Sequence, residues 1–147
     1  MSLTEHDRTE LLAEPLSAVL SVDAGEGRGP LAVPIWFVHD AASGDLLMTT
    51  EEASRKVALL RAAGRATVLV QRSAPTLRYA SAEGPVSFSP TGRDLLHRIV
   101  DRYLPPEHRD VYVARSAVDT FVTVRLTPRR WIGGDLGPAA SLAPVEA

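Results

Sequence analysis

Three strand-like segments that follow one another without a helix between them constrain this chain most. Apolar and β-branched residues dominate the segments 16–22, 31–39 and 45–50, and the stretches between them are rich in glycine, proline and aspartate. Short apolar segments separated by such turn residues predict a β-meander. Because a doubly wound sheet needs strands and helices in alternation, this order argues against a dinucleotide-binding domain of that type.

The rest of the chain adds helices and further strands. A helical period replaces the strand period at residues 53–63, and Gly64 is placed to end that helix. Ser89 is predicted to cap another helix, in which Pro90 is the first residue. The other predicted strands are 65–71, 77–88 and 119–126, and the other predicted helices are 4–12, 90–103 and a short one after Pro105 and Pro106. We therefore expect a mainly β fold, a six-stranded antiparallel barrel with short helices at its ends.

Length and composition restrict the organisation of the chain. Its 147 residues leave room for one core, so we expect a single domain over residues 1–136. The small and polar residues 137–147 are predicted to form a disordered tail. The chain contains no cysteine, which excludes disulfides and thiolate ligands, and its four histidines show no metal-binding spacing, so no metal site is predicted.

Charge and hydropathy argue against nucleic-acid and membrane partners. The formal net charge of −2 provides no field that would attract a polyanion or an anionic membrane surface. No apolar run approaches the roughly 20 residues that a membrane-spanning helix needs. The acidic N-terminal segment lacks the basic and then apolar order of a signal peptide, so we expect a cytoplasmic protein.

The segment 49–56 combines hydroxyl and cationic side chains at the start of a predicted helix. Lys56 is the only lysine among the 16 lysine and arginine residues, and it follows Thr49, Thr50, Ser54 and Arg55. Free backbone N–H groups at a helix N-terminus favour anions, and the hydroxyl, guanidinium and ammonium groups add donors. This arrangement predicts a phosphate-binding site.

A plainer interpretation of the same segment is that Ser54 is only a helix cap, with Arg55 and Lys56 on a solvated face. Glu51 and Glu52 also count against an anion site, unless their side chains point away from it.

A second candidate feature is the strand segment Val33-Pro34-Ile35-Trp36. Pro34 argues for an edge position or a bulge, and unpaired backbone groups there could hydrogen-bond the edge of a flat heteroaromatic ring. The alternative is that Trp36 is a core residue, as most tryptophans in strands are.

Three further polar or aromatic residues are candidates with open roles. Gln71 and Tyr79 are either donors to a ring edge or ordinary surface residues. Trp131, placed just beyond the last predicted strand, either caps the barrel or reaches across a dimer interface.

The order of these features resembles the flavin-binding split-barrel superfamily related to pyridoxamine 5′-phosphate oxidase. The resemblance runs from Leu12 to Leu136. Within the superfamily, the chain is similar in particular to small actinobacterial members that bind FMN or the deazaflavin coenzyme. It rests on four stretches of this sequence, "AVLSVDAGEGRGPLAVPIWFVHDAASGDLLMTT", "SRKVALLRAAGRATVLV", "YASAEGPV" and "VTVRLTPRRWIGGDLG".

The resemblance implies roles for the candidate residues. The backbone at 33–36 would lie against the flavin ring, Thr49 and Thr50 would contact the ribityl-phosphate region, and Ser54, Arg55 and Lys56 would bind the phosphate. Trp131 would come from the neighbouring subunit, because sites of this family form in a homodimer. Two departures stand out: residues 56–60 lack the asparagine frequent in the family, and no basic C-terminal segment favours vitamin B6 oxidation.

The function expected from this resemblance is that of a flavin-dependent oxidoreductase. It would bind FMN, or alternatively the deazaflavin coenzyme, and transfer hydride to or from a small planar substrate, with no side chain evident as a general acid. The alternative is a non-catalytic flavin, haem or tetrapyrrole carrier on the same barrel, for which His39 is the candidate haem ligand. A bare interaction module with an empty cleft is a third class.

Overall fold

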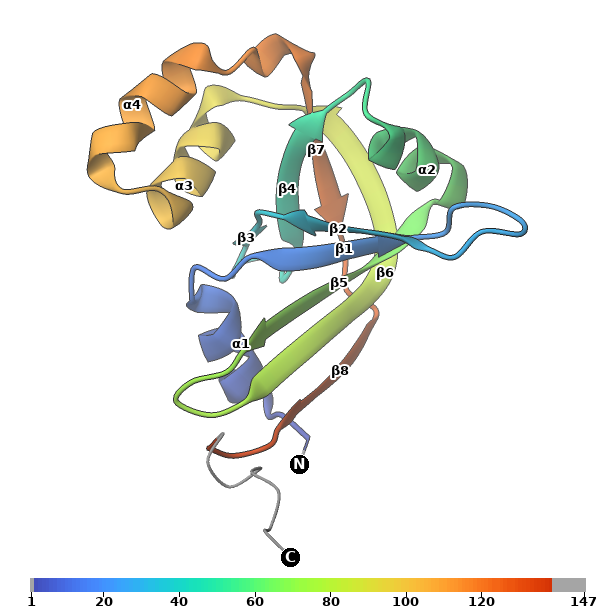
Figure 1. The fold of residues 1–147 in the computed structure, drawn as a ribbon, viewed down its shortest axis with the longest axis vertical. Coiled ribbons are helices and arrows are strands. Elements are labelled where there is room, and N and C mark those ends of the chain that lie inside the picture. The colour runs from blue at the N-terminus through green and yellow to red at the C-terminus, as the bar shows by residue number, and fades with distance from the viewer. Residues whose placement is uncertain (1, 139–147) are drawn as a thin grey trace, which may run out of the picture.

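A computed structural model describes residues 2–138 of the chain (Figure 1). The helices are α1 (Glu5–Ala13), α2 (Arg55–Ala63), α3 (Arg93–Tyr103) and α4 (Pro106–Arg115), with a 3-10 turn at Val118–Thr120. The strands are β1 (Ala18–Val22), β2 (Leu31–Ile35), β3 (Val38–His39), β4 (Leu46–Glu51), β5 (Arg65–Arg72), β6 (Arg78–Pro90), β7 (Phe121–Leu126) and β8 (Arg130–Asp135). The predicted mainly β fold with short helices is confirmed.

All strand pairs are antiparallel, and one long strand joins the two parts of the sheet. The strand order is β2-β1-β5-β6-β7-β4-β3, with β8 paired to β6 off this path. The first part of β6 pairs with β5 and β8, and its last residues, 86–90, pair with β7. Because β6 bends between these partners, the sheet curls into a split barrel (Figure 1).

Two hydrophobic cores hold the elements together. The larger lies inside the barrel and includes Leu20, Met48, Val68 and Val124, each with no exposed surface. The smaller lies between α3 and α4, around Val100. Figure 1 shows these two helices side by side, on the opposite side of the barrel from α2.

Local signals explain several element boundaries. The Thr4 hydroxyl accepts a hydrogen bond from the Asp7 N–H and so caps α1. Gly64 ends α2 in the left-handed conformation, with φ at 74°, as predicted. Pro34 lies in β2, which is the edge strand of the sheet, so the expected edge position is confirmed.

Three element predictions are wrong. Pro90 does not open a helix, because it is the last residue of β6 and pairs with Val122; Gly92 instead precedes α3. The predicted strand 31–39 is broken after Ile35, which separates β2 from β3. Trp131 lies inside a strand, β8, rather than beyond the last one, so the sheet has eight strands instead of six.

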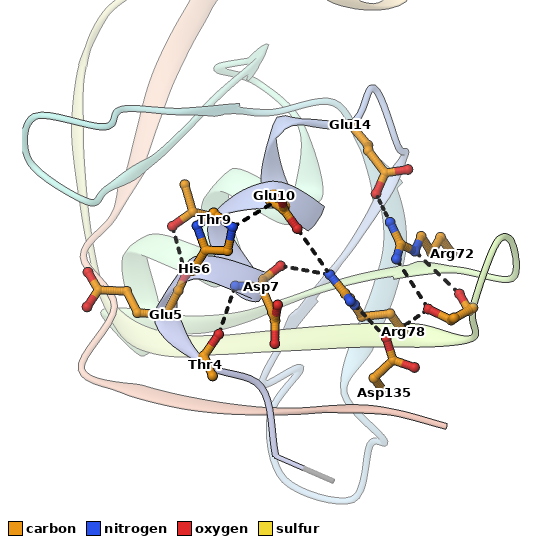
Figure 2. A network of polar contacts seen from close by, with 11 residues as sticks. Thr4, Glu5, His6, Asp7, Thr9, Glu10, Glu14, Arg72, Arg78 and Asp135 are labelled. Carbon is orange, nitrogen blue, oxygen red and sulfur yellow. Dashed lines mark hydrogen bonds and ion pairs between the residues drawn. The ribbon is translucent and has the colours of Figure 1, made fainter. Parts of the chain in front are cut away.

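Polar contacts fix α1 and β8 to the end of the barrel (Figure 2). The Arg78 guanidinium donates to Asp135 Oδ2 at 2.8 Å and to the Asp7 carbonyl at 3.3 Å. The Arg72 guanidinium donates to Glu14 Oε2 at 2.6 Å. The Leu77 N–H donates to the Gly137 carbonyl, which keeps the chain in contact with the barrel beyond β8. Of the predicted disordered tail, residues 139–147 lie outside the described residues.

Candidate functional site

A cavity of about 440 Å³ lies between the barrel and the α3–α4 pair. The predicted site residues that line it are Pro34, Ile35, Trp36, Thr49, Thr50 and Lys56, and the remaining lining residues are Ser17, Glu51, Leu96, Ile99, Tyr112 and Phe121. We call this the barrel cavity. It therefore brings together the proline-interrupted strand and the segment at the start of α2, which lie about twenty residues apart in the sequence.

One end of the barrel cavity is polar and carries a cation. Thr49 and Thr50 end β4, and Lys56 is a partly buried residue of the first turn of α2. No ion pair of Lys56 is found within residues 2–138. The Glu52 carboxylate accepts from Arg61 at 2.8 Å, which holds it on α2, whereas Glu51 does line the cavity.

The start of α2 has unused hydrogen-bonding groups. Ser54 occupies the capping position, but its side chain caps no N–H group, and its buried Oγ has no partner in the described chain. The first bond of the helix runs from the Ala58 N–H to the Ser54 carbonyl, so the N–H groups of residues 55–57 precede the helical ladder. These donors give this end of the helix a positive potential.

Aromatic side chains form the wall at the other end. The ring of Trp36 stacks on Tyr103, with centroids 5.0 Å apart and planes 7° apart, and a tilted Tyr112 lies 6.1 Å away. The Tyr103 hydroxyl donates to the Leu16 carbonyl at 2.8 Å and accepts from the Phe37 N–H at 3.2 Å. Tyr103 thus satisfies backbone groups where the chain leaves β2, and the break there lets Trp36 reach the cavity.

The remaining predicted site residues lie outside the barrel cavity. Val33 packs against the barrel core, and the Arg55 side chain is exposed at the start of α2. Gln71 and Tyr79 are cross-strand partners on β5 and β6. Trp131 packs against the barrel core with the Arg8 guanidinium 4.5 Å from its ring centroid, whereas Ile132, on the other face of β8, is exposed.

Sequence reasoning missed the part of the wall that α3, α4 and β7 supply. Leu96 and Ile99 are buried residues of α3, and Tyr112 and Phe121 come from α4 and β7. An aromatic residue, Tyr112, on a short predicted helix was the available signal, but nothing local shows that α4 lines the same cavity as the end of β4.

His39 does not line the barrel cavity. Burial and the neighbouring Arg8 lower its pKa, which favours the neutral imidazole. Within residues 2–138, no group of three histidine, aspartate or glutamate side chains is placed to hold a metal ion.

Comparison with known proteins defines the class of this chain. The family model described as pyridoxamine 5′-phosphate oxidase matches residues 3–133, nearly the whole described chain. The protein belongs to this family. Among curated proteins there is no match.

Solved structures show the same fold. An FAD-binding protein from Mesorhizobium loti is similar with a TM-score of 0.72 and 18% identity, covering 93% of this chain and 98% of that one. An F420 reductase has a TM-score of 0.68 and 23% identity, over 83% and 93% of the two chains. The heme storage protein from Vibrio cholerae has a TM-score of 0.66 and 14% identity, over 89% and 95%. At these identities the likeness concerns the fold, which is the split barrel of the pyridoxamine 5′-phosphate oxidase family. This fold is compatible with flavin enzymes and with carriers.

None of the helices in residues 2–138 combines the length and the apolar character needed to cross a membrane.

Proposed function

We propose that the protein is a flavin-dependent oxidoreductase that binds FMN in the barrel cavity and transfers hydride to or from a small planar organic substrate. The observation that carries the proposal is the meeting, in one cavity, of Lys56 and the start of α2 with the backbone of Pro34-Ile35-Trp36. Membership of the pyridoxamine 5′-phosphate oxidase family supports it. The cytoplasmic location stays a prediction.

The residues of the cavity fit the two ends of FMN. Lys56 lines the cavity and makes no ion pair within residues 2–138, and the N–H groups of residues 55–57 lie at the adjoining start of α2, so these are donors that suit a phosphate. The Ser54 Oγ, buried and without a partner in the described chain, lies next to them. Thr49 and Thr50 are placed for the ribityl hydroxyls, and the edge strand β2 offers backbone groups to the ring. Arg55 is exposed beside these donors, from where its long side chain can approach the phosphate.

The chain's own residues would bind and orient the ring rather than exchange protons. When bound, the flavin supplies the hydride chemistry. Trp36, Leu96 and Ile99 form an apolar wall that excludes water from one side of the cavity. Among the described residues that line it, the charged ones are Glu51 and Lys56, and Lys56 is assigned to the phosphate.

Charge placement favours FMN over the deazaflavin coenzyme. The longer acidic tail of the deazaflavin would need a broad basic groove, for which the candidate residues are Arg28, Arg61, Arg65 and Arg72. Arg61 pairs with Glu52 at 2.8 Å, and Arg72 pairs with Glu14 at 2.6 Å. Because two of these four guanidinium groups are paired within the chain and none of the four lines the barrel cavity, we assign FMN as the cofactor and keep the deazaflavin as the alternative.

A homodimer is part of the proposal, and the sheet offers a surface for it. Side chains that alternate with the buried ones form an outward row across five strands, whose members in register are Pro34, Val19, Leu69, Ser81 and Ile132. Val19 is 36% exposed and Ile132 is 61% exposed. Pro34 also lines the barrel cavity, so a second copy packed on this row would border the cofactor.

This dimer would give the more distant predicted residues a role. Gln71 and Tyr79 lie on the same outward face as Leu69 and Ser81, because side chains alternate along a strand. We propose that they serve the partner's cavity. Trp131 points to the opposite face and packs on its own core, so of its two candidate roles we propose the local cap on the barrel rather than the reach across the dimer.

Comparing FMN with riboflavin tests the phosphate site directly. The protein with Lys56→Ala and Arg55→Ala should bind FMN more weakly by ~2–4 kcal/mol, the scale of lost charge-assisted hydrogen bonds. Riboflavin lacks the phosphate, so its affinity should be unchanged. Trp36 and Trp131 are the two tryptophans of the chain, and in a Trp131→Phe background quenching of Trp36 fluorescence reports binding.

The matched control is Arg61→Ala, which removes a cation of α2 that points to Glu52. Equal losses for FMN and riboflavin in the double variant, or no loss at all, would refute the phosphate assignment. Reconstitution with FMN and with the deazaflavin in parallel decides between the two cofactors, since only the true one should survive desalting.

A non-catalytic carrier is the second candidate function, favoured by the fold that the chain shares with the heme storage protein from Vibrio cholerae. The described lining contains no histidine, so the carrier would hold a flavin rather than haem through His39. A bound flavin that no nicotinamide reductant and no electron acceptor can reduce or reoxidise would support the carrier over the enzyme.

A further inference from the structure

A second cavity of about 530 Å³ adjoins the barrel cavity along α4. The two share Glu51, Tyr112 and Phe121. The other residues that line the second cavity are Leu104, His108, Val111, Arg115, Ser116, Ala117 and Thr120. We call it the α4 cavity. Because they share these residues, the two cavities are direct neighbours.

The α4 cavity displays apolar side chains that no other part of the described chain covers. His108, Val111, Tyr112 and Arg115 lie at helical spacing on one face of α4. Val111 is 52% exposed and Tyr112 40% exposed, whereas Val113 is the residue of α4 that packs into the helix pair. A short helix therefore points its apolar residues into the cavity instead of into the core.

Among the described residues that line the α4 cavity, Arg115 is the cationic one, and its exposed side chain is open to a ligand. The Ser116 hydroxyl donates to the Tyr112 carbonyl at 2.7 Å, and the Thr120 hydroxyl donates to the Ala117 carbonyl at 2.7 Å. Arg115, in contrast, makes no ion pair or hydrogen bond within residues 2–138. Its guanidinium has a fork of donors that matches a carboxylate.

The placement of charge gives the cavity a direction. Glu51 lies on the wall shared with the barrel cavity, and Arg115 lies on the wall that is not shared. An anionic ligand is therefore repelled from the Glu51 side and attracted to the Arg115 side. Tyr112 and Phe121, on the shared wall, leave the apolar part of such a ligand nearest to the barrel cavity.

We propose that the α4 cavity is the substrate compartment and that it takes a flat, apolar carboxylate, whose carboxylate group is bound by Arg115 and whose ring packs on Tyr112. This inference rests on the proposed function, since it places the substrate next to the cofactor. It also identifies Arg115 as a specificity-determining residue, because a neutral or cationic analogue gains nothing from it.

Calorimetric titration with matched probes tests the compartment. The probes are 1-naphthoate and the neutral 1-naphthalenemethanol, titrated into the wild-type protein, Arg115→Gln and Arg115→Lys. We expect Arg115→Gln to weaken naphthoate binding about fivefold to tenfold, the loss of one charge-assisted hydrogen-bonded contact, and to leave the alcohol unchanged. Arg115→Lys should retain part of the preference for the anion.

The matched control is Arg98→Gln, which removes an equal charge from the exposed surface of α3 outside the cavity. Equal weakening by Arg98→Gln, equal weakening of both probes by Arg115→Gln, or no binding of naphthoate to the wild-type protein would overturn the proposal. So would a loss of deazaflavin affinity in Arg115→Gln with naphthoate unaffected, because the cavity would then hold a cofactor tail.

Two more measurements separate this inference from its neighbours. Titrating the FMN-loaded and FMN-free protein distinguishes the failures: naphthoate binding that depends on Arg115 without any FMN binding refutes the proposed function alone. FMN binding without naphthoate binding refutes the compartment alone. If Val111→Asp converts a dimer to a monomer in sedimentation equilibrium, the α4 face is covered by a second copy and the proposal is wrong.

Discussion

The guanidinium of Arg102 closes the end of α1 from a helix about 90 residues away in sequence. It donates to the carbonyl groups of Leu12, at 2.8 Å, and of Ala13 and Glu14. The last turn of α1 contains no basic residue of its own, so these carbonyls would otherwise lack a cationic partner. The same guanidinium lies 4.7 Å from the ring centroid of Phe37. One side chain thus connects α1, α3 and the segment after β2.

We expect Arg102→Met to lower the free energy of unfolding by about 2–3 kcal/mol, because the apolar stem is kept while the carbonyls lose their donors. The measurement is urea unfolding, with an unchanged m-value to confirm that the same surface is exposed. Arg98→Met, an exposed position on the same helix, should change stability by at most about 0.5 kcal/mol. If Arg102→Met lowers the free energy of unfolding no more than this control does, the hydrogen bonds of Arg102 contribute nothing to stability.

A second residue makes stability depend on pH. Three hydrogen bonds to the Asp135 carboxylate lower its pKa from 3.8 to about 2. The largest effect comes from the Gly137 N–H, followed by the donors of Arg78 and Thr76. A lowered pKa in the folded state stabilises the protein above the ordinary pKa of the group, and this contribution is lost as the pH falls through the folded value.

Asp135→Asn should therefore melt below the wild type by a constant interval above about pH 4, the ordinary pKa range of a carboxyl group. As the pH falls from 4 towards 2, the wild-type carboxylate becomes protonated and the interval should shrink. Thermal unfolding of both proteins across this range measures it. An interval that stays constant or widens down to pH 2 would contradict the assigned pKa.

At the scale of elements, the bend of β6 depends on a close backbone approach. Gly84 lies where β6 leaves β5 and β8 for β7, and a Cβ at this position would be 1.9 Å from the Thr127 carbonyl oxygen. The Thr127 N–H donates to the Pro85 carbonyl, and the Arg129 N–H donates to the Glu83 carbonyl, which holds the β7–β8 connection against this bend. The obstacle is backbone, so it cannot rotate away.

We expect Gly84→Ala to destabilise the protein by about 2–4 kcal/mol, since the β7–β8 connection must move to admit a methyl group. The control is Gly29→Ala in the β1–β2 turn, where no atom lies within 4 Å of the added carbon and φ is not positive. That change should be neutral or slightly stabilising through the unfolded chain. Chemical denaturation compares the two, and similar stabilities for both variants would refute the close approach.

The same elements show what the sequence could reveal. The helix that ends at Gly64 and the edge position of Pro34 were predictable because their causes are local: a glycine that tolerates positive φ and a proline that lacks a donor. β8 was not predictable, because Gly133 and Gly134 weaken its strand propensity and its register is imposed by β6. The helix predicted to start at Pro90 was wrong for a similar reason, because pairing with β7 extends β6 through Ser89 and Pro90.

In the candidate site, too, the residues whose placement has a local cause could be predicted and the others could not. Lys56 and the threonines of β4 could be predicted, because they are adjacent in the sequence to a helix start that favours anions. Their meeting with residues 34–36 was expected from the family resemblance rather than from spacing. Tyr112 and Phe121 could not be predicted, because only the packing of the α3–α4 pair against the barrel brings them to the cavity.

At the scale of the whole molecule, the barrel cavity takes lining residues from both hydrophobic cores, and the α4 cavity takes them from the second core. The barrel core is built by the sheet with α1 and α2, and the second core is built between α3 and α4 (Figure 1). The polar lining residues of the barrel cavity come from the barrel and α2, and much of its apolar lining comes from the α3–α4 pair. The proposed binding of cofactor and substrate therefore depends on how the helix pair is held, which links the site to Arg102 and Tyr103.

The outward face of the sheet is the part of the molecule that the proposed homodimer makes testable. Ile132 is 61% exposed, so in a monomer Ile132→Asp should change stability by no more than about 0.5 kcal/mol. In a dimer packed on this row, the same change buries a carboxylate without a partner, which opposes association strongly. We expect the variant to keep its circular dichroism spectrum, to sediment at half the wild-type mass, and to bind FMN more weakly, because Pro34 connects the row to the barrel cavity.

Val111→Asp, at an exposed apolar position on α4, should remain dimeric. A dimer that tolerates aspartate at position 132 would assign the interface to another surface, and the cavity would then have to bind its cofactor without the partner's Gln71 and Tyr79.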